Sequence, residues 1–166
     1  MSTPGSESTL QAVVPAEMGR YFRHLGARVE RAVHSLPREK LWIKPFPFGN
    51  SVGHLVLHLT GNLNHYIGAK IAGSGYLRDR PNEFSDATEY PAEEVLGRFQ
   101  EAIAMVAAAV EALDEAQLVA RVSEEQPIET KFGLLLVCAA HLNNHIGQLS
   151  YLVQAQGHST QEPPIW

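Results

Sequence analysis

Two histidines near the C-terminus have the spacing of a metal-binding pair. His141 and His145 stand at the two ends of the segment His141-Leu142-Asn143-Asn144-His145. On an α-helix, residues at this spacing lie one turn apart on the same face, so both imidazoles can reach one cation. A third imidazole from another helix would complete a site with three protein ligands. Such a site keeps a coordination position open, which is typical of a metal that takes part in chemistry.

The third imidazole is expected from a helix that starts near Ser51, which carries His54, His58 and His65. At about 100° per residue, these three side chains lie within roughly 40° of one another. His58 lies in the middle of the apolar run, whereas His54 is one turn nearer the start and His65 is nearer the end. We therefore predict His58 as the ligand.

Polar residues around these histidines are candidates for orienting an imidazole or lining a pocket. Asn62 lies about one helical turn after His58, and Gln148 lies slightly less than one turn after His145. His54 and His65 are candidates for the same roles, with packing or surface positions as the alternative.

A shared cation explains the five histidines better than separate burial does. One histidine on an apolar face is usually a hydrogen-bonded core residue. His141 and His145 share their face with Leu134 and Leu152, which we expect to point toward the core. Several buried imidazoles without partners would each cost about 1–3 kcal/mol. Neutral imidazoles without clustered carboxylates favour a divalent transition metal over calcium or magnesium.

The residue between the paired histidines excludes one familiar mechanism. In the H-E-x-x-H motif of metalloproteases, the residue after the first histidine is the general base, and here it is Leu142. Cys138 precedes His141 by less than one turn and is interpreted as a small buried residue that could also approach the site.

The composition limits the class of protein. A chain of 166 residues is long enough for one domain with a substantial core. A formal net charge of −5 and a pI of about 5.9 argue against nucleic acid as a partner. No apolar run reaches the roughly 18 residues of a membrane span. Cys138 is the only cysteine, so no internal disulfide forms. We predict a soluble cytoplasmic protein that binds neither nucleic acid nor a membrane.

The apolar spacing predicts an all-α fold with four helices. They are expected over about residues 15–36, 51–72, 91–113 and 132–156. Residues 1–14 have few large apolar groups and are expected to form a flexible tail before a single domain over residues 15–166. Two prolines make residues 41–49 an apolar loop that packs, and residues 73–90 form a second, longer loop.

With these residues identified, the chain resembles the DinB-like (damage-inducible) superfamily of four-helix-bundle metalloproteins. The resemblance spans about residues 15–157. It rests on His58-Leu59-Thr60-Gly61-Asn62 and on the element His141-x-x-x-His145-Ile146-Gly147-Gln148. The segment Arg78-Asp79-Arg80-Pro81-Asn82-Glu83-Phe84 is similar to one in an uncharacterised branch of the superfamily.

The resemblance implies an up-down-down-up bundle with His58, His141 and His145 as ligands, usually to zinc or nickel. It also implies a homodimer, for which the alanines at positions 107 and 108 offer an apolar helix face. The superfamily contains thiol-dependent S-transferases and isomerases. Leu142 departs from the glutamate often found after the first histidine, so a base at that position is not expected.

Two functions are compatible with these features. The first is a metal-dependent enzyme of the thiol S-transferase or hydrolase type, which acts on a small molecule and uses water or a low-molecular-weight thiol as the nucleophile. The loop of residues 78–84 would cover the site, with Arg78 or Arg80 binding an anionic group or lying in solvent. The alternative is a noncatalytic metal-binding bundle that acts in storage, sensing or partner contact. A closed site favours the bundle, and an accessible one favours the enzyme.

Overall fold

Four long helices dominate the computed structural model, which describes residues 9–122 and 128–160. They are α1 (Leu10–His34), α2 (Val52–Leu63), α4 (Ala92–Glu111) and α6 (Lys131–Ala155). No β-strand forms among the described residues, and Arg121 and Thr130 make only an isolated bridge. The predicted all-α class is therefore confirmed.

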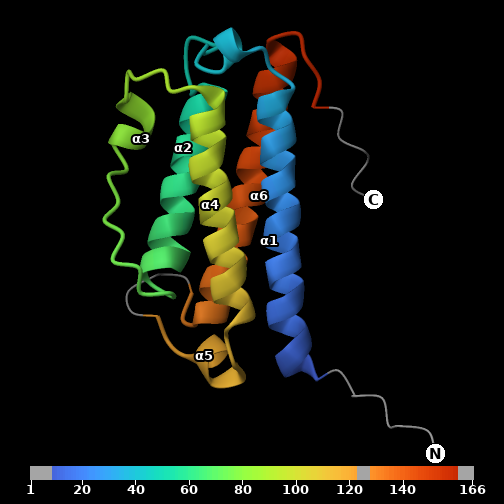
Figure 1. Cartoon of the computed structure of the whole chain (residues 1–166), viewed down its shortest axis with the longest axis vertical. Coiled ribbons are helices and arrows are strands. Elements are labelled where there is room, and N and C mark those ends of the chain that lie inside the picture. Colours follow the sequence, from blue (N-terminus) through green and yellow to red (C-terminus); the bar gives the residue numbers. More distant parts are fainter. Residues whose placement is uncertain (1–8, 123–127, 161–166) are drawn as a thin grey trace, which may run out of the picture.

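The helices form an up-down-down-up bundle. Figure 1 shows α1 running upward, α2 and α4 running downward, and α6 running upward again. α1 packs against α4 and α6, and α2 packs against the same two helices. α1 and α2 are therefore diagonal, although a single loop joins them. This arrangement confirms the predicted topology and makes α2 and α6 neighbours, as the histidine site requires.

Side-chain caps fix the starts of the helices that carry the histidines. The Ser51 hydroxyl accepts a hydrogen bond from the backbone N–H of His54, and Thr130 accepts one from Gly133. Each cap satisfies a backbone donor that has no partner inside the helix. Both α2 and α6 therefore begin close to the predicted positions, which sets the register of the histidines along them.

The first helix begins earlier than predicted. α1 starts at Leu10, capped by Thr9, so residues 10–14 belong to the helix and not to the expected tail. Pro15 lies inside the helix. Proline is common at the first position of a helix, which is why the sequence pattern placed the start there. The rest of the predicted tail, residues 1–8, lies outside the described residues.

Four short elements were not predicted from the sequence. A 3₁₀ turn, η1 (Arg38–Lys40), follows α1, and a π-helical segment, η2 (Asn64–Ala69), extends α2. The long connection to α4 carries α3 (Asn82–Ser85), which packs beside α2 (Figure 1). α5 (Glu115–Val119) begins with a capping box formed by Asp114 and Gln117.

The core includes part of the α4 face that was predicted to make dimer contacts. Phe22, Phe99 and Leu142 are fully buried between the helices. Ala107 is buried and therefore packs within the chain, whereas Ala108 lies at the surface. In the described part of the chain, no helix combines the length and apolarity that a membrane crossing needs.

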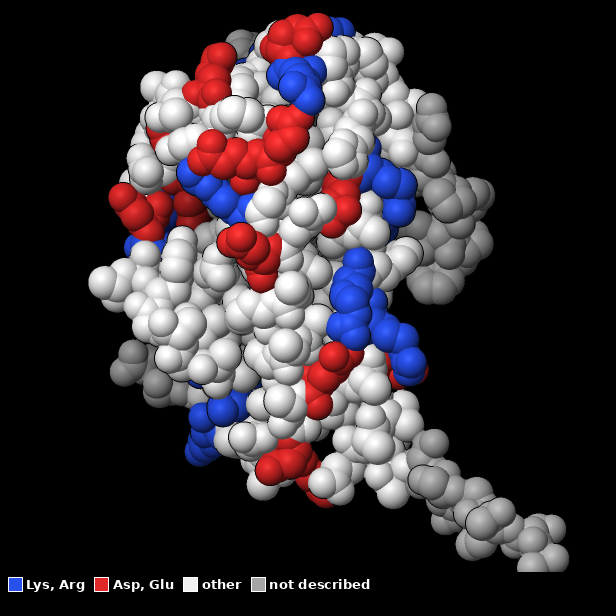
Figure 2. Space-filling view, in the orientation of Figure 1, with Lys and Arg blue, Asp and Glu red and all other residues white. Residues whose placement is uncertain are grey.

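Charged side chains are mixed over the visible surface. Figure 2 shows acidic and basic residues interspersed on this face, without a continuous basic area. On α1, Arg20 pairs with Glu17 and Arg23 pairs with Glu111 of α4. Arg28 is buried and donates a hydrogen bond to Asn143 of α6. Arg20, Arg23 and Arg28 are therefore each paired with a residue of this chain.

Gly53 allows the loop before α2 to pack closely, and its substitution should destabilise the bundle. A Cβ atom at this position would lie 2.7 Å from the indole ring of Trp42. That indole also donates a hydrogen bond to the carbonyl of Tyr90. We expect Gly53→Ala to lower the free energy of unfolding by about 1–3 kcal/mol through overpacking.

The matched control is Gly97→Ala on α4, where an added Cβ meets no atom within 4 Å. It should raise the free energy of unfolding by about 0.5–1 kcal/mol, because alanine favours the helix. Urea denaturation of both variants measures the difference. Equal stability of the two variants would contradict the packing argument.

Candidate metal centre

Three imidazoles from two neighbouring helices meet in the bundle. His58 comes from α2, and His141 and His145 come from successive turns of α6. One nitrogen atom from each ring lies within 4.8 Å of the others. The ring centroids are 4.5 Å apart for the α6 pair, and 4.9 Å and 5.2 Å from His58 to His145 and His141. The structure therefore brings together the three histidines selected from the sequence.

The spacing of the nitrogens suits a shared cation. Bonds of about 2.0–2.1 Å with tetrahedral angles place two nitrogen ligands roughly 3.4 Å apart. The Nε2 atoms of His58 and His141 are 3.1 Å apart. At that distance, two unprotonated nitrogens repel each other unless a proton or a cation lies between them. The cluster is thus compact enough for a small transition-metal ion without rearrangement of the helices.

A buried carboxylate fixes which nitrogen of His58 carries the proton. Glu83 of α3 is buried, and its Oε2 atom lies 2.8 Å from Nδ1 of His58. An ionised carboxylate only accepts hydrogen bonds, so Nδ1 carries the hydrogen and donates it. The lone pair of His58 is then on Nε2, which faces His141. Such a carboxylate–histidine pair is a common support of metal-ligating imidazoles.

Arg78 holds Glu83 in place, and Gly61 makes room for it. Nε and Nη2 of Arg78 lie 2.7 Å and 2.8 Å from the two carboxylate oxygens, which is a bidentate ion pair. Arg78 Nη2 is also 3.2 Å from His58 Nδ1, but both atoms are donors here, so this is a contact through their shared carboxylate oxygen. A Cβ atom on Gly61 would lie 2.1 Å from Glu83 Oε1.

Gln148 accepts a hydrogen bond from His145, as Glu83 does from His58. Its side-chain oxygen Oε1 lies 2.7 Å from Nδ1 of His145, from which it accepts a hydrogen bond. The proton is therefore held on Nδ1, and the lone pair is left on Nε2. Gln148 thus contacts the imidazole that its spacing along the sequence suggested, and it also lines the cavity beside the cluster.

The imidazoles are kept neutral by their surroundings. Burial is the main cause that lowers the pKa of His58, and the carboxylate of Glu83 only partly offsets it. Burial and the neighbouring imidazoles lower the pKa of His141 to about 4. Burial also lowers the pKa of His145. Metal binding requires neutral imidazoles, so the cluster is in the binding form at neutral pH.

A cavity of about 540 Å³ opens beside the cluster. All three imidazoles line it, together with Asn62 and Cys138. Asn62 is therefore placed in the pocket wall, as its sequence position suggested. Burial raises the pKa of the Cys138 thiol to about 12, so the side chain is neutral and acts as a small apolar surface.

His54 does not join the imidazole cluster. It is buried against the edge of the Trp42 ring, 5.2 Å between centroids, and both its ring nitrogens have partners. Nδ1 accepts from the Ser51 hydroxyl at 2.6 Å, and Nε2 donates to the carbonyl of Asp86 at 3.2 Å. His54 therefore joins the start of α2 to the segment after α3.

His65 is turned away by the π-helical segment. Lys70 donates its backbone N–H to the carbonyl of His65, five residues earlier, which widens the turn. The α-helical spacing used in the sequence analysis therefore fails after Leu63. His65 packs at a ring-centroid distance of 4.8 Å against the edge of Tyr66, and Tyr66 instead lines the cavity. His65 is not among the residues that line it.

The two arginines of the covering loop have different surroundings. Arg78 forms an ion pair with Glu83, the partner of His58, so its guanidinium supports the imidazole and does not bind a substrate anion. Arg80 is exposed, lines the cavity and lies over the ring of Phe84 at 5.5 Å. In the described ranges no carboxylate pairs with Arg80. Of the two arginines considered from the sequence, only Arg80 has a guanidinium available for an anionic group.

The residues between the paired histidines face other helices. Leu142 is fully buried in the core, and Asn143 accepts the hydrogen bond from Arg28. No Asp or Glu is found among the described residues that line the cavity. Within the described ranges, no side chain of this cavity therefore supplies the carboxylate base that position 142 lacks.

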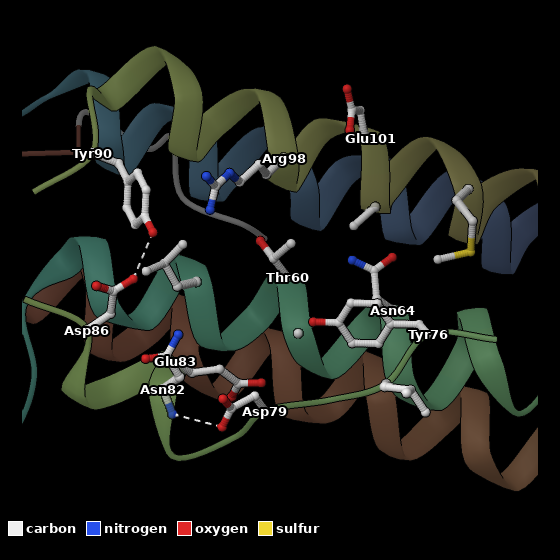
Figure 3. Close-up of a pocket in the computed structure, with 15 residues that line it drawn as sticks. Thr60, Asn64, Tyr76, Asp79, Asn82, Glu83, Asp86, Tyr90, Arg98 and Glu101 are labelled. Carbon is white, nitrogen blue, oxygen red and sulfur yellow. Dashed lines mark hydrogen bonds between the residues drawn. The ribbon is translucent and has the colours of Figure 1, made fainter. Parts of the chain in front are cut away.

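A second hollow of about 570 Å³ lies on the other side of Glu83. Figure 3 shows Arg98 and Glu101 of α4 on one wall, with Thr60 and Asn64 across from them, Asp79 in the loop and Asn82 at the start of α3. The Tyr90 hydroxyl donates to Asp86 there. None of the three clustered imidazoles lines this hollow, although Glu83 does.

Glu83 is the functional residue that the sequence analysis missed. It lies in the four-residue helix α3, within a connection that has no apolar periodicity, and its partner His58 is far away in the chain. The sequence contained one signal of this close contact. Gly61 lies inside α2 about one turn after His58, at a position where a helix favours alanine. A glycine at such a position indicates close approach by another group. The sequence could not say which group that was.

Comparison with known proteins supports the same fold. The DinB superfamily model matches residues 21–149. YfiT from Bacillus subtilis, described as a probable metal-dependent hydrolase with an unusual four-helix bundle topology, superposes with a TM-score of 0.70 at 20% identity. The match covers 96% of this chain and 95% of YfiT. No curated protein matches the chain. The three-histidine bundle described above thus belongs to the DinB superfamily.

Proposed function

We propose that this chain is a metal-dependent enzyme of the hydrolase or thiol S-transferase type. The observation that carries the proposal is the cluster of His58, His141 and His145, whose nitrogens meet at the wall of an accessible cavity. We propose these three as ligands of a divalent transition metal, zinc or nickel. The description of YfiT as a metal-dependent hydrolase agrees with this assignment.

The cavity favours catalysis over a purely structural metal. His141 and His145 are only partly buried, and a cavity of about 540 Å³ adjoins them. A metal that only ties helices together is usually closed off by four protein ligands. Three imidazoles beside an open hollow leave space for a substrate and a nucleophile. This accessibility is what supports the enzyme over a storage or sensing bundle.

The residues around the cluster have distinct tasks in this proposal. Glu83 and Gln148 hold the protons on Nδ1 of their histidines, so that each Nε2 keeps its lone pair. Arg80 binds an anionic group of a small-molecule substrate. A bound divalent metal supplies Lewis acidity, which polarises an electrophile and lowers the pKa of water or a thiol. No carboxylate lines the cavity among the described residues, so none of them is assigned as a base.

The proposed reaction is tested with zinc-loaded and nickel-loaded protein. Candidate electrophiles and esters are supplied with and without a low-molecular-weight thiol, and product formation is followed by mass spectrometry. Turnover that needs the metal and the thiol identifies an S-transferase, and turnover that needs only the metal identifies a hydrolase. A fully loaded protein that binds small metal ligands but converts no substrate would favour the noncatalytic bundle.

The proposed ligand set predicts which variants lose metal. We expect about one zinc or nickel ion per chain in the wild-type protein, and almost none after His141→Ala and His145→Ala together. His58→Ala should weaken zinc affinity more than about 100-fold, which exceeds the loss typical of an outer partner. His54→Ala should leave the affinity nearly unchanged, because both its nitrogens bind other residues.

Elemental analysis and competitive zinc titration at pH 7.5 measure these effects. The control double variant is His24→Ala with His34→Ala, two exposed histidines of α1. Metal content that stays unchanged in the α6 double variant would reject the site. Equal losses in the His58 and His54 variants would reject the single-ligand assignment on α2.

The support by Glu83 predicts graded losses of zinc affinity. Glu83→Ala should weaken binding about 10–100-fold, because His58 loses the acceptor that orients it. Glu83→Gln should lose less, since the amide oxygen still accepts a hydrogen bond. Gly61→Ala should behave like Glu83→Ala, because the added methyl group occupies the position of the carboxylate. Gly97→Ala is the control, and wild-type affinity in Glu83→Ala would contradict this role.

We also propose that the chain forms a homodimer, as membership of the superfamily suggests. Sedimentation equilibrium at micromolar concentration should then give twice the 18.3 kDa mass of the chain. Ala107 is buried within the chain, so Ala107→Ser should not dissociate the dimer. A single species with the mass of one chain would reject the proposal.

A further inference from the structure

Three aromatic rings form an exposed stack at one end of α6. Phe46 lies between Phe48 and Tyr151, with ring centroids 5.7 Å apart in both pairs and nearly parallel planes. Phe48 is 75% exposed and Tyr151 is 64% exposed. The apolar loop over residues 41–49 thus packs only in part: Leu41 is buried and Phe46 is partly buried against the core, whereas Phe48 is largely exposed. An exposed apolar cluster of this kind marks a binding surface.

The stack forms one wall of a groove that continues the imidazole cavity. The groove has a volume of about 560 Å³ and is also lined by Gly147 and Leu152 of α6. Three residues, Asn50, Leu55 and Gln148, line both this groove and the cavity beside the histidines. Gln148 is also the residue that binds His145. A molecule that reaches the imidazoles can therefore extend along α6 into the groove.

Gly147 keeps the floor of the groove open. A Cβ atom at this position would meet no atom within 4 Å, so packing against another part of the chain does not require glycine here. Glycine weakens a helix by about 0.5–1 kcal/mol relative to alanine. Its position between the proposed ligand His145 and Tyr151 places a surface without a side chain beside the aromatic rings.

We propose that this groove binds the apolar, preferably aromatic, part of the substrate whose reacting end lies at the three imidazoles. The inference rests on the proposed function. Tyr151 lies roughly 9 Å along the helix axis from His145, because each residue advances about 1.5 Å. The substrate is therefore an elongated amphiphile, with an electrophilic end and an apolar group separated by a short chain. An aromatic ring in the groove is stabilised by stacking on the aromatic rings of the groove wall as well as by burial of its apolar surface.

The test compares two hydroxamates on the zinc-loaded full chain by isothermal titration. Acetohydroxamate binds the open metal position alone, and 5-phenylpentanohydroxamate carries a ring on a chain long enough to reach the stack. We expect the aryl compound to bind about 10-fold more tightly, which corresponds to one well-packed aromatic contact. Phe46→Ala with Tyr151→Ala should abolish this advantage and leave the affinity for acetohydroxamate unchanged.

Two further variants separate the groove from general effects. Gly147→Leu should fill the groove and weaken only the aryl compound. Leu136→Ala removes an exposed apolar residue of α6 that lines neither hollow, and it should change neither affinity. Zinc content, measured for every variant, should stay at the wild-type level.

The possible failures are distinct. Equal affinity of the two hydroxamates for the wild-type protein, with acetohydroxamate bound, would overturn the groove assignment and leave the proposed function intact. Failure of both compounds to bind the zinc-loaded chain would reject the open metal position and the inference with it. Sedimentation of the Phe46 and Tyr151 double variant gives a further check. A dimer that dissociates on this substitution would show that a second copy of the chain covers the rings, and would also overturn the assignment.

Discussion

The hydrogen bond from His58 to Glu83 is the contact on which the geometry of the site depends. It joins an imidazole inside the bundle to the loop that covers it. A buried carboxylate costs several kcal/mol unless it is paired, and here His58 and the two nitrogens of Arg78 satisfy it. Gly61 leaves the space that the carboxylate occupies. The loop and the imidazole are therefore joined through one carboxylate, which contacts both Arg78 of the loop and His58 of α2.

Two neighbouring helices supply the three imidazoles of the cluster, and the closeness of these rings has an electrostatic consequence. Burial keeps each ring neutral, while acceptors at Nδ1 direct the lone pairs of His58 and His145 toward a common point. Converging lone pairs repel one another in a medium that screens them poorly. A cation relieves this repulsion without any movement of α2 or α6. For the proposed metal, the three imidazoles are thus already close together before binding, which lowers the ordering cost.

Local chemistry explains what the sequence could predict. Apolar spacing gave the long helices, the caps at Ser51 and Thr130 set two of their starts, and the helical repeat joined His141 to His145. Features that depend on contacts between residues far apart in the chain could not be predicted from the sequence. Gly61 indicates that some group approaches α2 near His58, but it does not identify that group as Glu83, because the connection that carries Glu83 has no periodicity. The π-helical turn that redirects His65 has no local sequence signal either, and it invalidated a rotation argument that assumed a regular helix.

The two faces of α6 show how one helix serves both stability and chemistry. Leu142, Ile146 and Leu149 are fully buried and hold the helix to the core. His141 and His145 lie on another face, only partly buried, at the cavity wall. The residues that share this second face, Leu134 and Leu152, are buried but line the cavity and the groove, so their apolar surfaces bound the hollows. The prediction that this face points toward the core is confirmed for Leu134 and Leu152, and the same face also forms part of the wall of the site, so one stripe of α6 contributes to both the core and the cavity.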